Sequence, residues 1–263
     1  MEATTLLFEA DFEAPGFTVG TLVSDPNSDW SFSNALLDVE VVDVDPAYNL
    51  QSLLLTGSGA FTLTADDQLA AQVRWVDFYV KPVFVAEGDL TTSVSSLQSA
   101  VSAFVQSGGV GQVYVINGDG LGSGAWVSAE KPLTLTGSVS QDWVRLTYRL
   151  DYAGKRWDLF VDDQLALIDL GFLDDGFTSL EAFAIKGDSS TATAFDYFYA
   201  GAENPVFVDA DNDGINDVFD LNTALNGRDA DPDGDSLTNI EEFMHGTEML
   251  ARDPDFDLLS DLM

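Results

Sequence analysis

Short runs in which apolar and polar residues alternate extend over the first 200 residues of the chain. Alternation places apolar side chains on one face of a β-strand, and the Gly, Asp, Asn and Ser residues between the runs are typical of turns. No amphipathic helix is expected before residue 203, so the pattern predicts an all-β fold, an antiparallel sandwich of two sheets. The expected strands are residues 5–13, 36–44, 51–56, 60–64, 71–85, 100–106, 111–117, 132–137, 142–150, 156–161, 164–168, 180–186 and 191–200.

Several strand segments follow one another in the order of a known family. FEADFEAPGF comes first, SDWSF, VRWVDFYVKPVF and QVYVINGDG follow, and ATAFDYFYAG ends the region. The runs WVRLTYRL and RWDLFVDD, separated by DYAGK, predict a β-hairpin. The order resembles the concanavalin A-like (laminin G-like) jelly rolls of secreted bacterial proteins, over about residues 5–201. The resemblance implies an antiparallel two-sheet jelly-roll sandwich.

The composition changes near residues 201–205, where GAENP is typical of a turn. Residues 203–263 hold 17 acidic and 2 basic side chains, whereas residues 1–202 hold 28 and 8 and are rich in Val, Phe, Leu, Thr, Ser and Gly. We therefore predict two units, a sandwich of residues 1–202 and a small acidic repeat region of residues 203–263.

The acidic region begins with a candidate calcium loop, DADNDGINDVFD, at residues 209–220. Carboxylates stand at loop positions 1, 3, 5, 9 and 12, which are Asp209, Asp211, Asp213, Asp217 and Asp220. Gly214 at position 6 permits the sharp turn of such a loop, and Ile215 at position 7 offers its backbone carbonyl. The spacing predicts Ca²⁺ as the ligand of this loop.

Two further segments repeat this spacing at steps of 22 residues, which marks an internal repeat. In DPDGDSLTNIEE, Ser236 replaces the glycine at position 6, and the predicted ligands are Asp231, Asp233, Asp235, the carbonyl of Leu237, Asn239 and Glu242. In DPDFDLLSD, the sequence ends before position 12, and the predicted ligands are Asp253, Asp255, Asp257 and Asp261. The third loop is either degenerate or cut from a longer array.

The repeats, with the phrase DGDSLTNIEEFMHGTE between the second and third loops, resemble the thrombospondin type 3-like calcium repeats of secreted bacterial proteins. One alternative is an acidic linker without metal, although five carboxylates within twelve residues repel one another strongly when no cation is present. Another alternative is a dockerin. That family has a full helix after each loop, and the ten residues LNTALNGRDA give less than three helical turns.

The opening strand holds the carboxylates Glu9, Asp11 and Glu13, which alternation would place on one face. Laminarinase-like glycoside hydrolases with this fold use such a strand for catalysis, which would suit retaining hydrolysis. Jelly-roll modules with an opening DFE phrase bind a structural calcium ion instead, and Asp11, Glu13 and Asp196 match that pattern by resemblance. The third alternative is that these carboxylates are solvated.

A candidate ligand-binding loop lies at residues 117–126, NGDGLGSGAW, because it is long, polar and rich in glycine. Aromatic faces suit the C–H surfaces of sugar rings, and two tryptophans lie in Asp-, Ser- or Gly-rich stretches. The candidate carbohydrate-binding residues are therefore Trp30, Trp126, Asn117 and Asp119. The alternatives are core packing for the tryptophans and an ordinary strand connection for the loop.

The charge and composition exclude several classes of function. With 45 acidic and 10 basic residues and a net charge of −35, the chain is not expected to bind nucleic acid or anionic membrane surfaces. It has no Cys and one His, so neither thiol chemistry nor an imidazole-rich metal site is expected. No apolar run of membrane-spanning length occurs, so no membrane insertion is expected, and the N-terminus does not resemble a signal peptide.

We therefore predict a calcium-stabilised, non-catalytic module for recognition or adhesion, which binds polysaccharide or a cell-surface glycan. The resemblances imply an extracellular or cell-surface location and a longer multidomain protein of secreted bacterial type. Two other functions stay open, a polysaccharide-cleaving hydrolase or lyase on the same fold, and a structural spacer stiffened by calcium.

Overall fold

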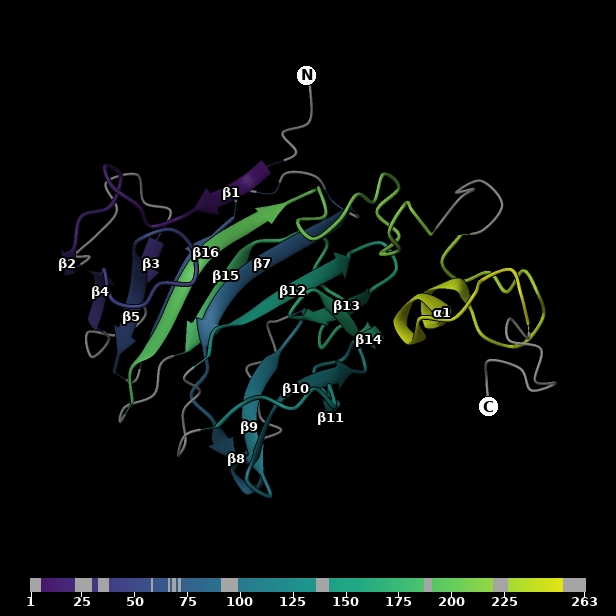
Figure 1. Cartoon of the computed structure of the whole chain (residues 1–263), viewed down its shortest axis with the longest axis horizontal. Coiled ribbons are helices and arrows are strands. Elements are labelled where there is room, and N and C mark those ends of the chain that lie inside the picture. Colours follow the sequence, from purple (N-terminus) through teal and green to yellow (C-terminus); the bar gives the residue numbers. More distant parts are fainter. Residues whose placement is uncertain are drawn as a thin grey trace.

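The computed structural model describes residues 6–21, 30–32, 38–57, 59–65, 67, 70, 72–90, 99–135, 142–186, 191–219 and 227–252. These residues form one large sheet and two small ones (Figure 1). The large sheet has the order β14 (Gln164–Gly171), β13 (Arg156–Val161), β12 (Val144–Asp151), β7 (Val73–Lys81), β16 (Thr193–Gly201), β5 (Ser52–Thr56), β4 (Asp38–Val42) and β2 (Gly20–Thr21). A further strand, β1 (Leu6–Ala10), pairs with β16.

The two small sheets lie against one face of the large sheet. One has the order β11 (Gly124–Ser128), β10 (Val110–Gly118), β9 (Ser102–Ser107) and β8 (Val85–Ala86), and the other has the order β15 (Ala182–Lys186), β6 (Ala60–Thr64) and β3 (Trp30–Phe32). Phe61 of β6 and Val113 of β10 share a core with Val76 and Phe78 of β7. The predicted all-β sandwich is therefore confirmed, with antiparallel pairing except between β8 and β9.

Alternation in β7 gives its two faces different surroundings. Val76, Phe78 and Val80 point into the sandwich core, whereas Trp75 points to the opposite face, here called the outer face of the large sheet. Each large apolar side chain that folding buries contributes about 1.5–3 kcal/mol, so the inward set fixes the register of this strand.

The expected strands at residues 60–64 and 156–161 match β6 and β13 to the residue, and the predicted hairpin is β12 and β13. The expected strand at residues 132–137 is wrong in its described part, because only an isolated bridge from Leu133 to Gly111 forms there. The short strands β2, β3, β8 and β11 and the 3₁₀ turn Glu87–Asp89 were not predicted. These segments are too short to show a period of their own, and their partner strands determine them.

The opening strand ends earlier than alternation predicts. It stops at Ala10, and Phe12 adopts a left-handed backbone with φ of 57°. This conformation places the Phe12 ring in the core, fully buried, at 5.3 Å from the ring of Phe17 and 5.9 Å from that of Phe195. The prediction of three carboxylates on one strand face is therefore wrong, since only Glu9 lies on the strand.

The acidic tail packs on the outer face of the large sheet (Figure 1). Trp75, Phe160 and Leu165 of the sheet form a second core with Ile215 and Ile240 of the tail. The one helix in the described part of the chain is α1 (Asn239–His245), which has a Thr238–Glu241 capping box and ends at Gly246. No described helix has the length and apolar character needed to cross a membrane. The division at residue 202 stays a prediction.

Candidate metal centre

The first acidic loop folds around three carboxylates. One oxygen from each of Asp209, Asp211 and Asp213 lies within 4.8 Å of the others. The backbone N–H groups of Asp213 and Gly214 donate to the two oxygens of Asp209, each over 3.1 Å. Gly214 has φ of +95°, which favours glycine at this turn. The loop thus brings together the side chains that the spacing assigned to positions 1, 3 and 5.

Burial raises the pKa of Asp209 to about 6, because the charged carboxylate loses solvent there. Two other predicted ligands have structural contacts. Ile215 is buried in the second core, and Asp217 accepts a hydrogen bond from the N–H of Ala210 over 3.0 Å. Asp220 lies outside the described residues, as do Asp253, Asp255, Asp257 and Asp261 of the third loop.

The second loop repeats this arrangement. One oxygen from each of Asp231, Asp233 and Asp235 lies within 4.8 Å of the others. The N–H of Gly234 donates to Asp231 over 2.7 Å, and the N–H of Leu237 donates to Asp235 over 2.8 Å. Ser236, which replaces the glycine of the first loop, has φ of 88°. The conformation typical of glycine at this position is therefore kept with a serine, at a cost in strain.

The interior of the second loop contains carboxylate oxygens without hydrogen-bond donors. Asp235 is 4% exposed, and the Oδ2 atoms of Asp233 and Asp235 are buried and accept no hydrogen bond from the described residues. Asn239 and Glu242, the predicted ligands at positions 9 and 12, are fully buried on α1. A buried carboxylate oxygen without a donor costs free energy, which a divalent cation would offset. These residues fit Ca²⁺, a hard cation that prefers oxygen ligands.

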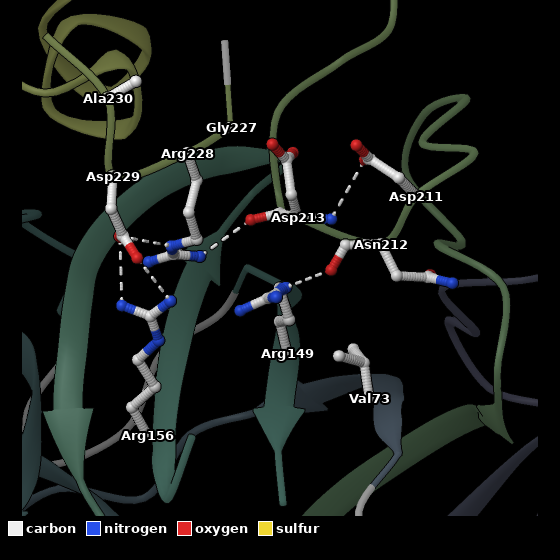
Figure 2. A pocket seen from close by; sticks show the side chains of 10 residues that line it. All are labelled: Val73, Arg149, Arg156, Asp211, Asn212, Asp213, Gly227, Arg228, Asp229 and Ala230. Atoms are coloured by element: carbon white, nitrogen blue, oxygen red, sulfur yellow. Dashed lines mark hydrogen bonds and ion pairs between the residues drawn. The ribbon is translucent and has the colours of Figure 1, made fainter. Parts of the chain in front are cut away.

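An ion-pair network joins the tail to the large sheet (Figure 2). The guanidinium of Arg228 binds both oxygens of Asp158, over 2.7 and 3.0 Å, and Arg149 donates to the same carboxylate over 3.1 Å. Burial raises the pKa of Asp158, but the hydrogen bonds and charge of Arg228 and the charge of Arg149 outweigh burial and hold it below its usual range. Asp158 is therefore a buried anion held between two cations.

A hollow of about 510 Å³ lies at this junction. Figure 2 shows the side chains that line it. They come from β7, β12 and β13, from the first loop, and from the four residues before the second loop. The lining residues are Val73, Arg149, Arg156, Asp211, Asn212, Asp213, Gly227, Arg228, Asp229 and Ala230. Its arginines are already paired with carboxylates or carbonyls, so the hollow is part of the tail–sheet contact.

The calcium site predicted at the opening strand has a different arrangement from the two tail loops. Glu13 Oε1 accepts the N–H groups of Leu50 and Gln51, each over 2.7 Å, and Asp11 Oδ1 accepts the N–H of Glu13 over 3.1 Å. Asp196 Oδ2 accepts the N–H of Tyr48 over 2.7 Å. These carboxylates thus accept hydrogen bonds from backbone N–H groups of loops. The carboxylate triads within the described residues are those of the two tail loops, so calcium at Asp11, Glu13 and Asp196 stays a prediction.

The titration of Asp196 predicts a dependence of stability on pH. Burial, and to a smaller extent the charge of Glu13, raise its pKa from 3.8 to about 6. The folded state then binds this proton more tightly than the unfolded state, so the free energy of unfolding falls as pH rises from about 4 to about 6. Asp196→Asn should remove this contribution, as measured by urea unfolding at several pH values. Asp89→Asn, at an exposed carboxylate, should keep the wild-type slope, and an equal slope in Asp196→Asn would contradict the assignment.

The residues predicted to bind carbohydrate lie at separate places. Asn117 Oδ1 accepts the N–H of Gly171 over 2.8 Å, and Asp119 Oδ1 accepts the N–H groups of Leu121 and Ser123 over 2.9 and 3.0 Å. These backbone hydrogen bonds lower the pKa of Asp119. Trp126 is half-buried on β11, and the side chain of Trp30, on β3, lies outside the described part. Asp119 thus holds the loop together, Asn117 connects it to β14, and a glycan contact here stays a prediction.

A different set of aromatic residues, each exposed or half-buried, includes Tyr79 of β7. We call it the aromatic group, and it consists of Tyr48, Tyr79, Trp143 and Tyr197. The rings of Tyr48 and Tyr197 are 5.0 Å apart, and Tyr48 is 43% exposed. Tyr79 alternates with the inward Phe78 and Val80, so it shares the outer face with Trp75. Alternation within β7 was the signal that could have identified Tyr79.

Polar groups surround the aromatic group. The guanidinium of Arg145 lies over the Tyr79 ring at 5.6 Å, and the ammonium of Lys81 lies over the Trp143 ring at 5.3 Å. Arg145 also binds the buried carboxylate of Asp77 over 2.8 Å. The rings are therefore fixed beside hydrogen-bonding groups, an arrangement that suits a ligand with both C–H and hydroxyl surfaces.

Comparison with known proteins identifies no family, since no family model and no curated protein matches the chain. Among solved structures, domain 4 of the extracellular GH43 arabinanase AbnA from Geobacillus stearothermophilus, in complex with arabinotriose, is 14% identical, with 78% of this chain and 96% of that chain covered and a TM-score of 0.44. The CBM22-1 xylan-binding domain of Paenibacillus barcinonensis Xyn10C is 16% identical, with 76% and 96% covered and a TM-score of 0.34. A sialidase is 10% identical, with 76% and 19% covered and a TM-score of 0.45. These likenesses are too distant to assign a function.

Proposed function

We propose that this chain is a calcium-stabilised, non-catalytic recognition module that binds carbohydrate, as part of a larger secreted protein. The observation that carries the calcium part is the second loop, where the Oδ2 atoms of Asp233 and Asp235 are buried without donors beside a third carboxylate. The first loop supports it, because its carboxylates have the same spacing and the same mutual approach.

In this proposal Asp231, Asp233 and Asp235 bind the ion of the second loop, and Asn239 and Glu242 complete its shell from α1. Extracellular modules of this kind bind calcium with dissociation constants of about 0.1–1 mM, which suits the calcium levels outside cells. Calorimetric titration of the chelator-treated chain with CaCl₂ tests this part. Heat of binding that falls in Asp235→Asn by the share of the second loop supports it, and the absence of any binding heat in the wild type contradicts it.

The carbohydrate part rests on the aromatic group. Its rings offer flat apolar surface for the C–H face of a sugar, while Arg145 and Lys81 lie close enough to contact hydroxyl groups. The net charge of −35 repels anionic polymers, so we propose a neutral polysaccharide as the ligand. The structural roles of Asp11 and Glu13 in holding loop backbone fit the non-catalytic part of the proposal.

Replacement of Tyr79 tests the carbohydrate site. Tyr79→Ala should weaken binding to a neutral polysaccharide by at least about tenfold, because truncation of a central aromatic contact commonly costs this much or more. Affinity electrophoresis in gels that contain xylan, arabinan or laminarin measures the retardation. Trp126→Ala is the control, and it should migrate as the wild type does.

A reversed result, in which Trp126→Ala loses retardation and Tyr79→Ala keeps it, would place the site at the 117–126 loop. Equal migration of the wild type in all gels with and without polysaccharide would contradict carbohydrate binding. Release of reducing sugar from these polymers by the wild type would contradict the non-catalytic part.

A further inference from the structure

The sheet holds the first calcium loop at Asn212. Arg149 Nε donates to the carbonyl of Asn212 over 2.8 Å, and Trp75 Nε1 donates to the side-chain oxygen of Asn212 over 3.0 Å. Asn212 stands between Asp211 and Asp213, two of the three carboxylates of this loop. The shape of the first loop therefore depends on its contact with the sheet.

Arg228 contacts both loops and the sheet. Its side chain is 5% exposed, and it donates to the carbonyl of Asp213 over 2.8 Å (Figure 2). It also donates to the Asp158 carboxylate. Its own carbonyl accepts the N–H of Ile240, in the first turn of α1, over 3.1 Å. Arg228 thus connects the first loop, the helix that completes the second loop, and a buried anion of the sheet.

The two loops also contact the sheet through apolar side chains. Ile215, at position 7 of the first loop, and Ile240, two positions before Glu242, are both buried against Trp75 and Phe160. The two segments that complete the calcium loops are therefore the segments that supply the apolar contact with the sheet.

We infer that calcium binding by the tail and docking of the tail on the outer face of the sheet are one coupled transition, with Arg228 as the positioning residue that links them. The inference rests on the proposed calcium binding. Without the ion, the buried oxygens of Asp233 and Asp235 have no donor and the loop carboxylates repel one another. The second loop then opens, α1 loses its position, and Ile240 leaves Trp75 and Phe160.

The coupling acts in both directions. A docked sheet orders the loops before the ion arrives, so the ion does not have to offset their full loss of conformational entropy. By thermodynamic linkage, docking raises calcium affinity by the same factor by which calcium strengthens docking, so a change that weakens docking lowers calcium affinity by up to that factor.

A distance measurement across the interface tests this inference. The chain has no Cys, so Val110→Cys on β10 and His245→Cys on α1 give a single pair of spin labels at exposed positions. Electron–electron double resonance should show one narrow distance in calcium and a broad distribution in chelator. Arg228→Gln in this background should be broad at a calcium level that gives a narrow distance in the parent, with calcium affinity about tenfold weaker by calorimetry.

Arg252→Gln is the matched control, because it removes the same charge from an exposed position of the tail. It should keep the parent distance and affinity, and Arg228→Lys should recover less than the parent because a single ammonium cannot bind both oxygens of Asp158. If Arg228→Gln does not fold, Arg156→Gln, which breaks the partly exposed pair with Asp229, should give a smaller shift in the same direction.

Two results separate the inference from the proposed function. If the chain binds calcium and the narrow distance persists in chelator, or calcium affinity is unchanged in Arg228→Gln, the coupling is wrong and the proposed calcium binding stands. If calorimetry detects no calcium binding by the wild type, the proposed function fails and the inference fails with it.

Discussion

Chelation of calcium is expected to lower the melting temperature of the chain by about 10 °C or more. A ligand at about 100 times its dissociation constant stabilises the folded state by about 2.7 kcal/mol per site, and two sites give about 5 kcal/mol. For a domain of this size, each kcal/mol shifts the melting temperature by about 2–4 °C. The two carboxylate triads, with Asp209 and Asp235 more than nine-tenths buried, are the physical reason.

Differential scanning calorimetry in 10 mM CaCl₂ (about 100 times a dissociation constant of about 0.1 mM) and in excess chelator measures this shift. Asp235→Asn removes one carboxylate from the second loop, so it should lose about half of the calcium-dependent shift. Asp89→Asn, an exposed carboxylate outside both loops, should keep the full shift. A melting temperature that is the same in calcium and chelator would contradict stabilisation of the chain by calcium.

The strands could be predicted where one face of a strand is buried and the other is not. Residues 60–64 became β6 to the residue, because their apolar side chains alternate cleanly. Residues 156–161 also became β13 to the residue, although three apolar residues follow one another at its end and both of its faces are buried. The end of β1 could not be predicted, since the need to bury Phe12 in the core overrides the alternation of the carboxylates around it. Alternation reports which residues share a face, and tertiary packing decides where a strand stops.

The candidate metal residues could be predicted because the loop is a local structure. Asp231, Asp233 and Asp235 lie within five consecutive residues, and the structure brings them together as the spacing indicates. Calcium itself stays a prediction. The partners of the loops were not accessible from the sequence, because Arg228 is 70 residues away from Asp158 along the chain. The outward positions of Arg149 and Asp158 on β12 and β13 indicate exposure to solvent until the tail covers them.

The buried carboxylate of Asp158 gives the second large prediction. Asp158→Ala should lower the free energy of unfolding by about 3–5 kcal/mol, because it leaves the guanidinium groups of Arg149 and Arg228 buried without their shared anion. The loss of one partner of a buried pair costs more than the pair itself contributes, since the remaining charge keeps its desolvation penalty. Urea unfolding in saturating calcium, followed by tryptophan fluorescence, measures the change.

Asp163→Ala is the control for this experiment, because it removes an aspartate paired with Arg145 that is 58% exposed. Ion pairs at the surface contribute less than about 1 kcal/mol, since solvent screens them and replaces their contacts. The difference between the two variants therefore isolates the effect of burial from that of a lost negative charge, which lowers the net repulsion equally in both. If Asp158→Ala were no less stable than Asp163→Ala, Arg149 and Arg228 would have to pair with other anions of the sheet. The nearest is Asp169, which already pairs with Arg228 over 2.8 Å. The Asp158 carboxylate would then add little to the contact between tail and sheet.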